Sequence, residues 1–85
     1  MNSKHRKTLQ ALREKPERGD IAWAEVEALL TALGCRKLEG SGSRVRFVSA
    51  TGLILRLHRP HPKPVVDKGA VKAPRRFLDE LEARP

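Results

Sequence analysis

Side chains suited to binding or cutting a polyanion are concentrated in two short segments that alternate polar and apolar residues. One is GSGSRVRF at residues 40–47, and the other is LILRLH at residues 53–58. A period of two places alternate side chains on opposite faces of a β-strand. The basic or titratable side chains on one face of these segments are Arg44, Arg46, Arg56 and His58. Because no acid is interleaved with them, this face is predicted to contact nucleic-acid phosphates, with a merely solvated strand face as the alternative.

Two histidines form an H-x-x-H pair, His58 and His61, where the second segment ends. Histidine exchanges a proton near neutral pH, so either residue is a candidate acid or base for attack of an RNA 2′-hydroxyl on its phosphate. A loop histidine beside prolines, without catalytic role, is the alternative. A zinc site would need two further ligands, and Cys35 and His5 are distant in the sequence. We therefore expect no metal and no other cofactor.

Two turns could extend a phosphate-binding surface. Gly42 and Ser43 are expected to lead into a strand and to lie within the RNA-binding surface; a serine nucleophile would lack a His–Asp relay. Lys68, with the free N–H groups of a helix start, could hold a phosphate, or Asp67 could simply cap that helix. Lys72 would continue the same path along the last helix.

Charge and composition limit the class of protein. The net charge is +8, and it is concentrated in residues 1–18 (six basic and two acidic groups) and 35–66 (seven basic groups and one acidic group). Such a balance favours polyanion partners. We expect no transmembrane helix, because no 18-residue apolar run occurs, and no secretory signal. The single Cys35 fits a reducing cytoplasm, where we expect the protein to act.

Periodicity predicts an α+β fold. An apolar stripe predicts a helix at about 23–33, with Gly34 following it, and alternation predicts strands at 35–39, 44–49 and 53–58. The order is α-β-β-β-α, a three-stranded antiparallel sheet with helices on one face and the basic side facing solvent. We expect a single domain at 21–85, preceded at 1–20 by a basic arm or a short helix that Ser3 would cap.

The last helix contains Pro74, which conflicts with one unbroken helix from Asp67. Two arrangements remain open. Either the helix kinks at Pro74, or a first turn at 68–72 is followed by a main helix with Pro74 at its first position.

Three stretches together resemble the HicA toxins of bacterial toxin–antitoxin pairs: AEVEALLTALGC, GSRVRF and HRPHPKPVVDKGAVKAPRRFLDEL, over about residues 22–82. The resemblance implies a double-stranded-RNA-binding-domain-like fold, mRNA cleavage and neutralisation by a HicB-type antitoxin. The family motif is Gly-Ser-x-His, and its histidine is credited with cleavage. Here the motif reads Gly42-Ser43-Arg44-Val45, so Val45 stands where the histidine should be.

The sequence therefore predicts a HicA-like toxin that binds mRNA in the cytoplasm and is held inactive by an antitoxin. Three outcomes remain open for the chemistry: His58 or His61 replaces the missing acid or base, Arg44 stabilises the transition state of a slower reaction, or the protein binds RNA without cutting it. A non-catalytic module that binds RNA or only a protein partner is the alternative function. The residues expected to bind RNA are Gly42, Ser43, Arg44, Arg46, Arg56, Lys68 and Lys72.

Overall fold

The computed structural model describes residues 2–83. Its elements in chain order are α1 (Ser3–Arg13), β1 (Ile21–Ala22), α2 (Trp23–Ala32), β2 (Arg36–Glu39), β3 (Arg44–Val48), β4 (Ile54–His58), β5 (Val65–Val66), the 3₁₀ turn η1 (Lys68–Ala70) and α3 (Lys72–Ala83). Among these residues, no helix is both long enough and apolar enough to cross a membrane.

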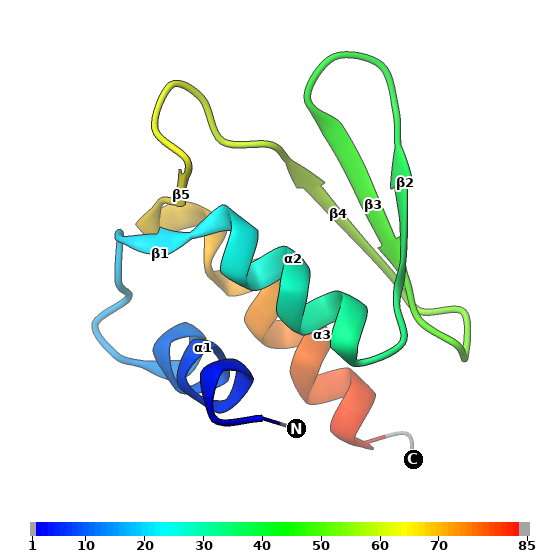
Figure 1. Cartoon of the computed structure of the whole chain (residues 1–85), viewed down its shortest axis with the longest axis horizontal. Coiled ribbons are helices and arrows are strands. Elements are labelled where there is room, and N and C mark those ends of the chain that lie inside the picture. Colours follow the sequence, from blue (N-terminus) through cyan, green and yellow to red (C-terminus); the bar gives the residue numbers. More distant parts are fainter. Residues whose placement is uncertain (1, 84–85) are drawn as a thin grey trace.

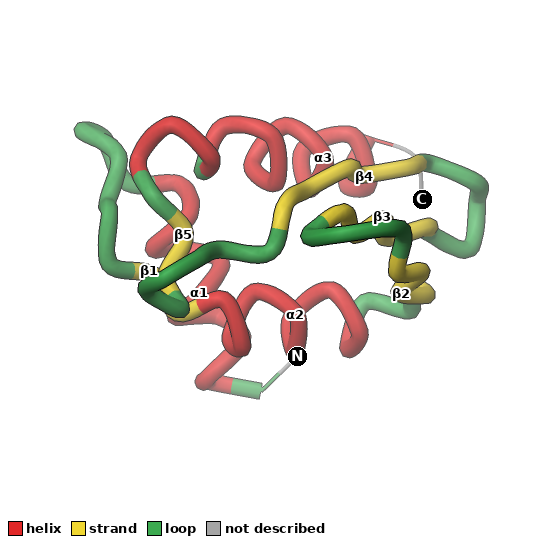
Figure 2. The backbone as a smooth tube through the Cα atoms, turned by 90° about the horizontal axis from the view of Figure 1, so that it is seen from above, coloured by secondary structure: helices red, strands yellow, loops and turns green. Residues whose placement is uncertain are grey.

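The centre of the fold is an antiparallel sheet in the order β2-β3-β4, with the helices gathered on one side of it (Figure 1; from above, Figure 2). Burial alternates along β3, where Val45 and Phe47 face the core and Arg44 and Arg46 face solvent. The predicted α+β fold, α-β-β-β-α with helices on one face, is therefore confirmed, and it is consistent with a double-stranded-RNA-binding-domain-like fold. Of the two forms expected for the N-terminal segment, arm or short helix, the structure has the helix.

Helix α2 forms because one stripe of its surface is apolar. Its inward side chains Trp23, Val26, Leu29 and Leu30 are buried. The helix ends at Ala32, and Gly34 follows its C-cap with a φ of 88°, in the left-handed region that glycine adopts without strain. This turn lets the N–H of Cys35 donate to the carbonyl of Leu30 at 3.0 Å, which satisfies a carbonyl that the helix leaves open.

Helix α1 begins one residue earlier than the sequence suggested. The side chain of Asn2, not of Ser3, caps it by accepting a hydrogen bond from the N–H of His5 at 2.8 Å, so the prediction of Ser3 as the cap is wrong. Asparagine caps as well as serine, and Ser3 is already within the helix. Helix α1 also contributes to the core, because Leu12 is fully buried.

The sequence pattern did not predict two short strands, β1 and β5. Strands β1 and β5 form a separate antiparallel pair in which Ile21 lies opposite Val66. The pair is extended by the N–H of Trp23, which donates to the carbonyl of Pro64 at 3.0 Å. It ties the start of α2 to the segment that leads into η1.

Of the two arrangements predicted for the last helix, the structure has the second, in which a first turn precedes a separate main helix. The side chain of Asp67 caps η1 by accepting a hydrogen bond from Ala70 N–H at 2.9 Å. Helix α3 then starts at Lys72, with Pro74 as its third residue rather than its first. Proline is tolerated there because the first four N–H groups of a helix have no partner within the helix.

Candidate nucleic-acid interface

Four side chains meet on the solvent side of β3 and β4. The register sets Arg44 opposite His58 and Arg46 opposite Arg56, and all four residues are exposed. We call this cluster of Arg44, Arg46, Arg56 and His58 the arginine face. Directly opposed residues of an antiparallel pair have Cβ atoms about 5 Å apart, so the cations form one contiguous group.

The arginine face borders a hollow of about 460 Å³ at the end of the β2–β3 hairpin. All four of its side chains contribute to the lining, together with Gly40 and Ser41 at the hairpin turn. The adjacent Gly42 has a φ of 65°, so the turn uses a conformation that glycine adopts more easily than other residues. A cationic hollow of this size can accept a phosphodiester group with its flanking sugars.

His58 is held in place by Ser43. The Ser43 hydroxyl lies 3.1 Å from Nδ1 of His58, within hydrogen-bond distance. The Ser43 carbonyl also accepts a hydrogen bond from the N–H of Arg59 at 2.7 Å, which fixes the backbone beside the imidazole. Because Nδ1 is engaged, Nε2 is the nitrogen left for a substrate. It accepts a proton when Nδ1 donates to Ser43 and carries one when Ser43 donates.

The arginines of this face are not neutralised by carboxylates. Within residues 2–83, Arg44, Arg46 and Arg56 make no ion pair. The nearby acid Glu39 is engaged instead by Arg59 and, at 3.6 Å, by Lys37. The positive potential of the face is therefore available to an external anion.

The remaining predicted site residues are more scattered. His61 lines a second hollow of about 420 Å³, to which His58 also contributes. Lys68 lies along Gly19, since a Cβ built there would be 3.3 Å from the Lys68 Cγ. Lys72 is close enough to Glu17 to add, after Arg75, to the lowering of the pKa of that carboxyl. Neither lysine lines the hollow beside the arginine face.

Val45 is a core residue. Its side chain is 1% exposed, and it points away from the arginine face toward the helices. Val45 is among the residues around the hollow beside the arginine face, but at 1% exposed it offers a substrate almost no surface, whereas its neighbours Ser43 and Arg44 are exposed.

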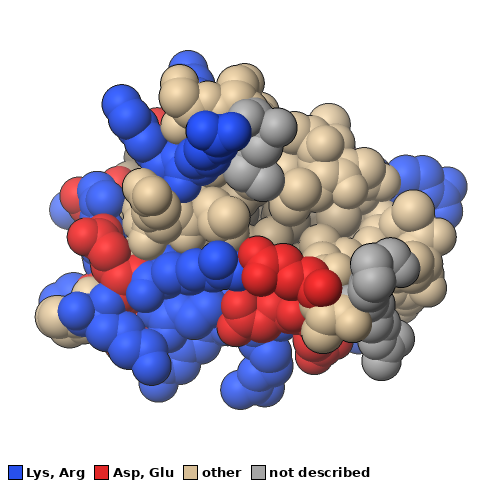
Figure 3. All heavy atoms as spheres, turned by 90° about the horizontal axis from the view of Figure 1, so that it is seen from below, with Lys and Arg blue, Asp and Glu red and all other residues tan. Residues whose placement is uncertain are grey.

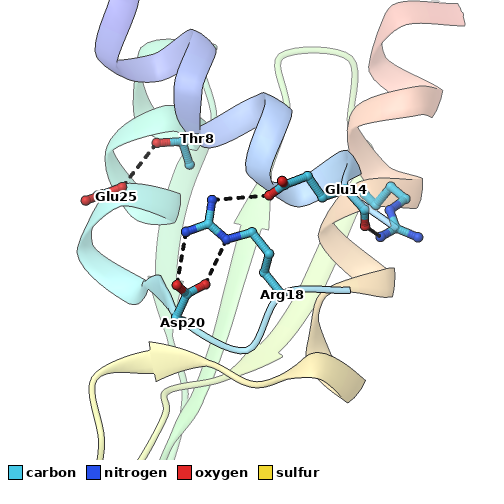
Figure 4. Close-up of polar contacts among 6 residues, drawn as sticks. Thr8, Glu14, Arg18, Asp20 and Glu25 are labelled. Carbon is cyan, nitrogen blue, oxygen red and sulfur yellow. Dashed lines mark hydrogen bonds and ion pairs between the residues drawn. The ribbon is translucent and has the colours of Figure 1, made fainter. Parts of the chain in front are cut away.

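A second group of arginines lies around α1. There three arginines contact carboxylates: Arg13 (Asp79 and Glu82), Arg18 (Glu14 and Asp20) and Arg75 (Glu17). We call these eight residues the α1 ion-pair network. In the view from below, basic and acidic side chains accordingly lie side by side (Figure 3). In the close-up, Arg18 lies between Glu14 and Asp20 (Figure 4). Its hydrogen bond to Asp20, together with its charge, lowers the pKa of that carboxyl.

Two contacts of the site could not be seen in the sequence pattern. The bond from Ser43 to His58 joins residues 15 positions apart and depends on the hairpin register. Extending the register by one residue pairs Ser43 with Arg59, so alternation alone does not bring the Ser43 side chain to His58. The contact of Arg59 with Glu39 has no signal in the pattern either, because each residue lies at the margin of a strand.

Metal ligation and thiol chemistry receive no structural support within residues 2–83. No three side chains from His, Cys, Asp and Glu are grouped there as metal ligands would be. Cys35 is buried, and burial raises the pKa of its thiol, which disfavours the reactive thiolate.

The fold and the site together define a class: a small α+β domain whose exposed sheet face carries unpaired arginines and a held histidine. Comparison with known families gives the assignment within that class. The family model described as the HicA toxin of bacterial toxin–antitoxin pairs matches residues 23–76, and the chain belongs to this family. It is therefore a toxin-type member of a toxin–antitoxin pair. No curated protein and no solved structure matches the chain.

Proposed function

We propose that this toxin acts in the cytoplasm, where it binds mRNA through its arginine face and cleaves it. His58 would accept a proton in the cleavage step, and a HicB-type antitoxin would hold the toxin inactive. One observation carries the proposal: the β3–β4 register places His58 among three arginines that have no carboxylate partner within residues 2–83. A proton acceptor beside uncompensated cations suits a reaction on a phosphodiester.

The phosphate backbone is the part of RNA that this surface would contact. The aromatic side chains Trp23, Phe47 and Phe77 are all buried, so they offer no platform on which bases could stack. Arginine binds phosphate through paired N–H groups and keeps its charge at all physiological pH values. Gly42 and Ser43 would lie beside the same strand of RNA, with Lys68 and Lys72 extending contacts only for a longer substrate.

The cleavage step would use the two histidines and two arginines of the site. Nε2 of His58 takes the proton of a ribose 2′-hydroxyl, and the 2′-oxygen attacks the adjacent phosphorus. The bond from phosphorus to the 5′-oxygen breaks, leaving a 2′,3′-cyclic phosphate and a 5′-hydroxyl whose proton comes from His61, which shares the second hollow with His58. Arg44 and Arg56 stabilise the extra negative charge of the transition state.

Binding without cleavage is the second candidate, and the valine at position 45 favours it. With a core valine at the motif position, the chain has no proton-transferring group there. The same arginine face would then hold RNA without cutting it.

The test compares cleavage and binding for the same end-labelled mRNA, with a chelator present, by gel electrophoresis. We expect the wild type to cut, and His58→Ala to cut at least about 100-fold more slowly while its affinity changes less than about threefold. His61→Ala should show a smaller loss. The matched control is His5→Ala on α1, which should cut normally.

Two results would change the assignment. Undiminished cutting by the His58→Ala, His61→Ala double variant would remove both histidines from the mechanism. A wild type that shifts RNA without cutting it would establish the second candidate.

A further inference from the structure

The outer edge of β4 carries no paired strand within residues 2–83. There β4 is the last strand of its sheet and pairs only with β3. The ladder is flanked by bonds from Ser49 N–H to Leu53 O at 2.9 Å and from Arg59 N–H to Ser43 O at 2.7 Å. In an antiparallel pair, alternate residues direct both backbone groups to the same neighbour. The backbone N–H and C=O groups directed away from β3 are therefore those of Ile54, Arg56 and His58.

A groove runs along this edge, between β4 and the segment from η1 to α3. It consists of two hollows, of about 200 and 420 Å³, that share Arg56 and Ala73. The smaller hollow also contains Phe77, Arg76 and Glu80, whereas the larger contains His58, His61 and Asp67. Ile54, at the start of the edge, is 42% exposed although it is apolar.

Hydrogen bonding and charge identify the occupant. A strand edge needs donors and acceptors in alternation, which an extended polypeptide supplies, whereas the phosphates of an RNA backbone only accept. A second copy of this chain is disfavoured because a symmetric pairing of two β4 strands centred on Arg56 sets two arginines directly opposite each other. The net charge of +8 adds to that repulsion.

We propose that a partner protein adds an extended segment to the outer edge of β4, with acidic side chains alternating with small apolar ones. The acidic side chains would lie on the solvent side, beside Arg56, and the apolar ones over Ala73 and Phe77. Five residues of such a strand span about 17 Å, the length of β4. The inference rests on the proposed function in one respect: the acidic side chains would occupy the arginine face and exclude RNA, which is how a protein antitoxin could silence this toxin.

The experiment uses the full chain and no assumed partner. A displayed library of random 12-residue linear peptides is selected on immobilised protein, and the enriched peptides are measured against three forms: wild type, Ile54→Pro and Ile54→Thr. Proline at position 54 removes an outward N–H at the first residue of an edge strand, where proline is tolerated, and threonine keeps that N–H. We expect acidic–apolar alternating peptides that bind wild type and Ile54→Thr equally and Ile54→Pro at least about tenfold more weakly.

Two further readouts keep the proposal falsifiable. Amide hydrogen exchange at Ile54, Arg56 and His58 should slow when the peptide binds. A peptide N-methylated at the alternate residues whose N–H groups would face β4 should not bind. This peptide tests the backbone hydrogen bonds even if Ile54→Pro does not fold. The proposal would be overturned if the peptides bound Ile54→Pro as tightly as wild type and the N-methylated peptide also bound tightly. It would also be overturned if no peptide were enriched over empty resin.

Three controls separate this inference from the proposed function. An RNA oligonucleotide that protects the same amides would assign the edge to the RNA site, and protection that grows with protein concentration alone would indicate pairing of two copies; either result would overturn the proposal. RNA affinity of Ile54→Pro should equal that of wild type. A wild type that binds the peptides but no RNA would refute the proposed function and leave the edge site intact.

Discussion

Arg13, Arg18 and Arg75 in the α1 ion-pair network each contact at least one carboxylate, whereas Arg44, Arg46 and Arg56 on the arginine face contact none within residues 2–83. The cations are arginines in both regions, so the type of cation does not distinguish them. The difference lies in what surrounds them: the network neutralises its own cations, and the arginine face leaves its cations to an external anion.

The two regions therefore use charge for different purposes. Arg75 reaches from α3 to donate to the carbonyls of Leu12 and Glu14, at 2.8 and 3.1 Å, and so satisfies the C-terminal end of α1. Its side chain is only 15% exposed. The network joins α1 and the segment after it to α3, whereas the arginines on the sheet are available to a ligand.

The largest expected effect is on RNA affinity when the charges of the arginine face are reversed. Arg46→Glu with Arg56→Glu should weaken RNA binding about 100- to 1,000-fold, because two phosphate contacts become repulsions. Neutralising the same two residues to alanine should reduce the slope of log K against log salt by about 1.4 to 1.8, at 0.7 to 0.9 for each phosphate. Fluorescence anisotropy over a salt series measures both quantities.

The matched control reverses the same amount of charge in the other region. Arg13→Glu with Arg18→Glu should change RNA affinity far less, because those arginines are already paired. Equal losses for the two double variants would mean that net charge alone, and not the arginine face, determines binding.

A second prediction concerns the two faces of β3. Val45→His should destabilise the protein by about 2–4 kcal/mol, because an imidazole at a position 1% exposed must be buried without a partner. Urea unfolding measures the change, and Val48→His, on the solvent side of the same strand, should cost less than about 1 kcal/mol. A stable Val45→His variant that cleaves RNA faster than wild type would show that position 45 can reach the substrate.

Features with a local period could be predicted from the sequence. The apolar stripe of α2 and the alternation in β3 and β4 each repeat several times, so they fixed the helix, the strands and the solvent side of Arg44 and Arg46. Helix boundaries were less certain, since Asn2 and Ser3 are equally good caps and only the backbone decides between them.

Features that depend on one long-range contact could not be predicted. Strands β1 and β5 have two residues each, too few to show a period. One contact that docks α1 comes from Arg75, which lies 63 residues from Leu12 in the sequence. The place of Lys68 and Lys72, away from the hollow beside the arginine face, likewise depends on how η1 and α3 pack against the segment that contains Gly19 and Glu17.

The third prediction tests the structural role of the network. Arg75→Met should lower the free energy of unfolding by about 2 kcal/mol, because it keeps much of the apolar stem but removes charged hydrogen bonds to two helix-terminal carbonyls. Thermal and urea unfolding measure the loss. Arg76→Met is the neighbouring exposed control and should change stability by less than about 0.5 kcal/mol. Similar losses for the two variants would mean that Arg75 does not hold α1.

The smallest expected effect is a pH dependence from the partner of Arg75. The hydrogen bond from Arg75 lowers the pKa of Glu17 below the ordinary value of 4.5. Because the folded state holds that proton less tightly than the unfolded state, the stabilisation is present above about pH 4.5 and is lost as the pH falls through the lowered pKa. Glu17→Gln should therefore be slightly less stable than wild type at pH 7, and the difference should shrink below pH 4.

Thermal melts between pH 3 and 7 measure this difference in stability, with Glu80→Gln on α3 as a control expected to follow the wild type. If the stability difference between Glu17→Gln and wild type stays constant across this pH range, the network stabilises α1 through the carbonyl contacts of Arg75 and not through the charge of Glu17. The contrast with the arginine face would then be one of hydrogen bonding rather than of neutralised charge.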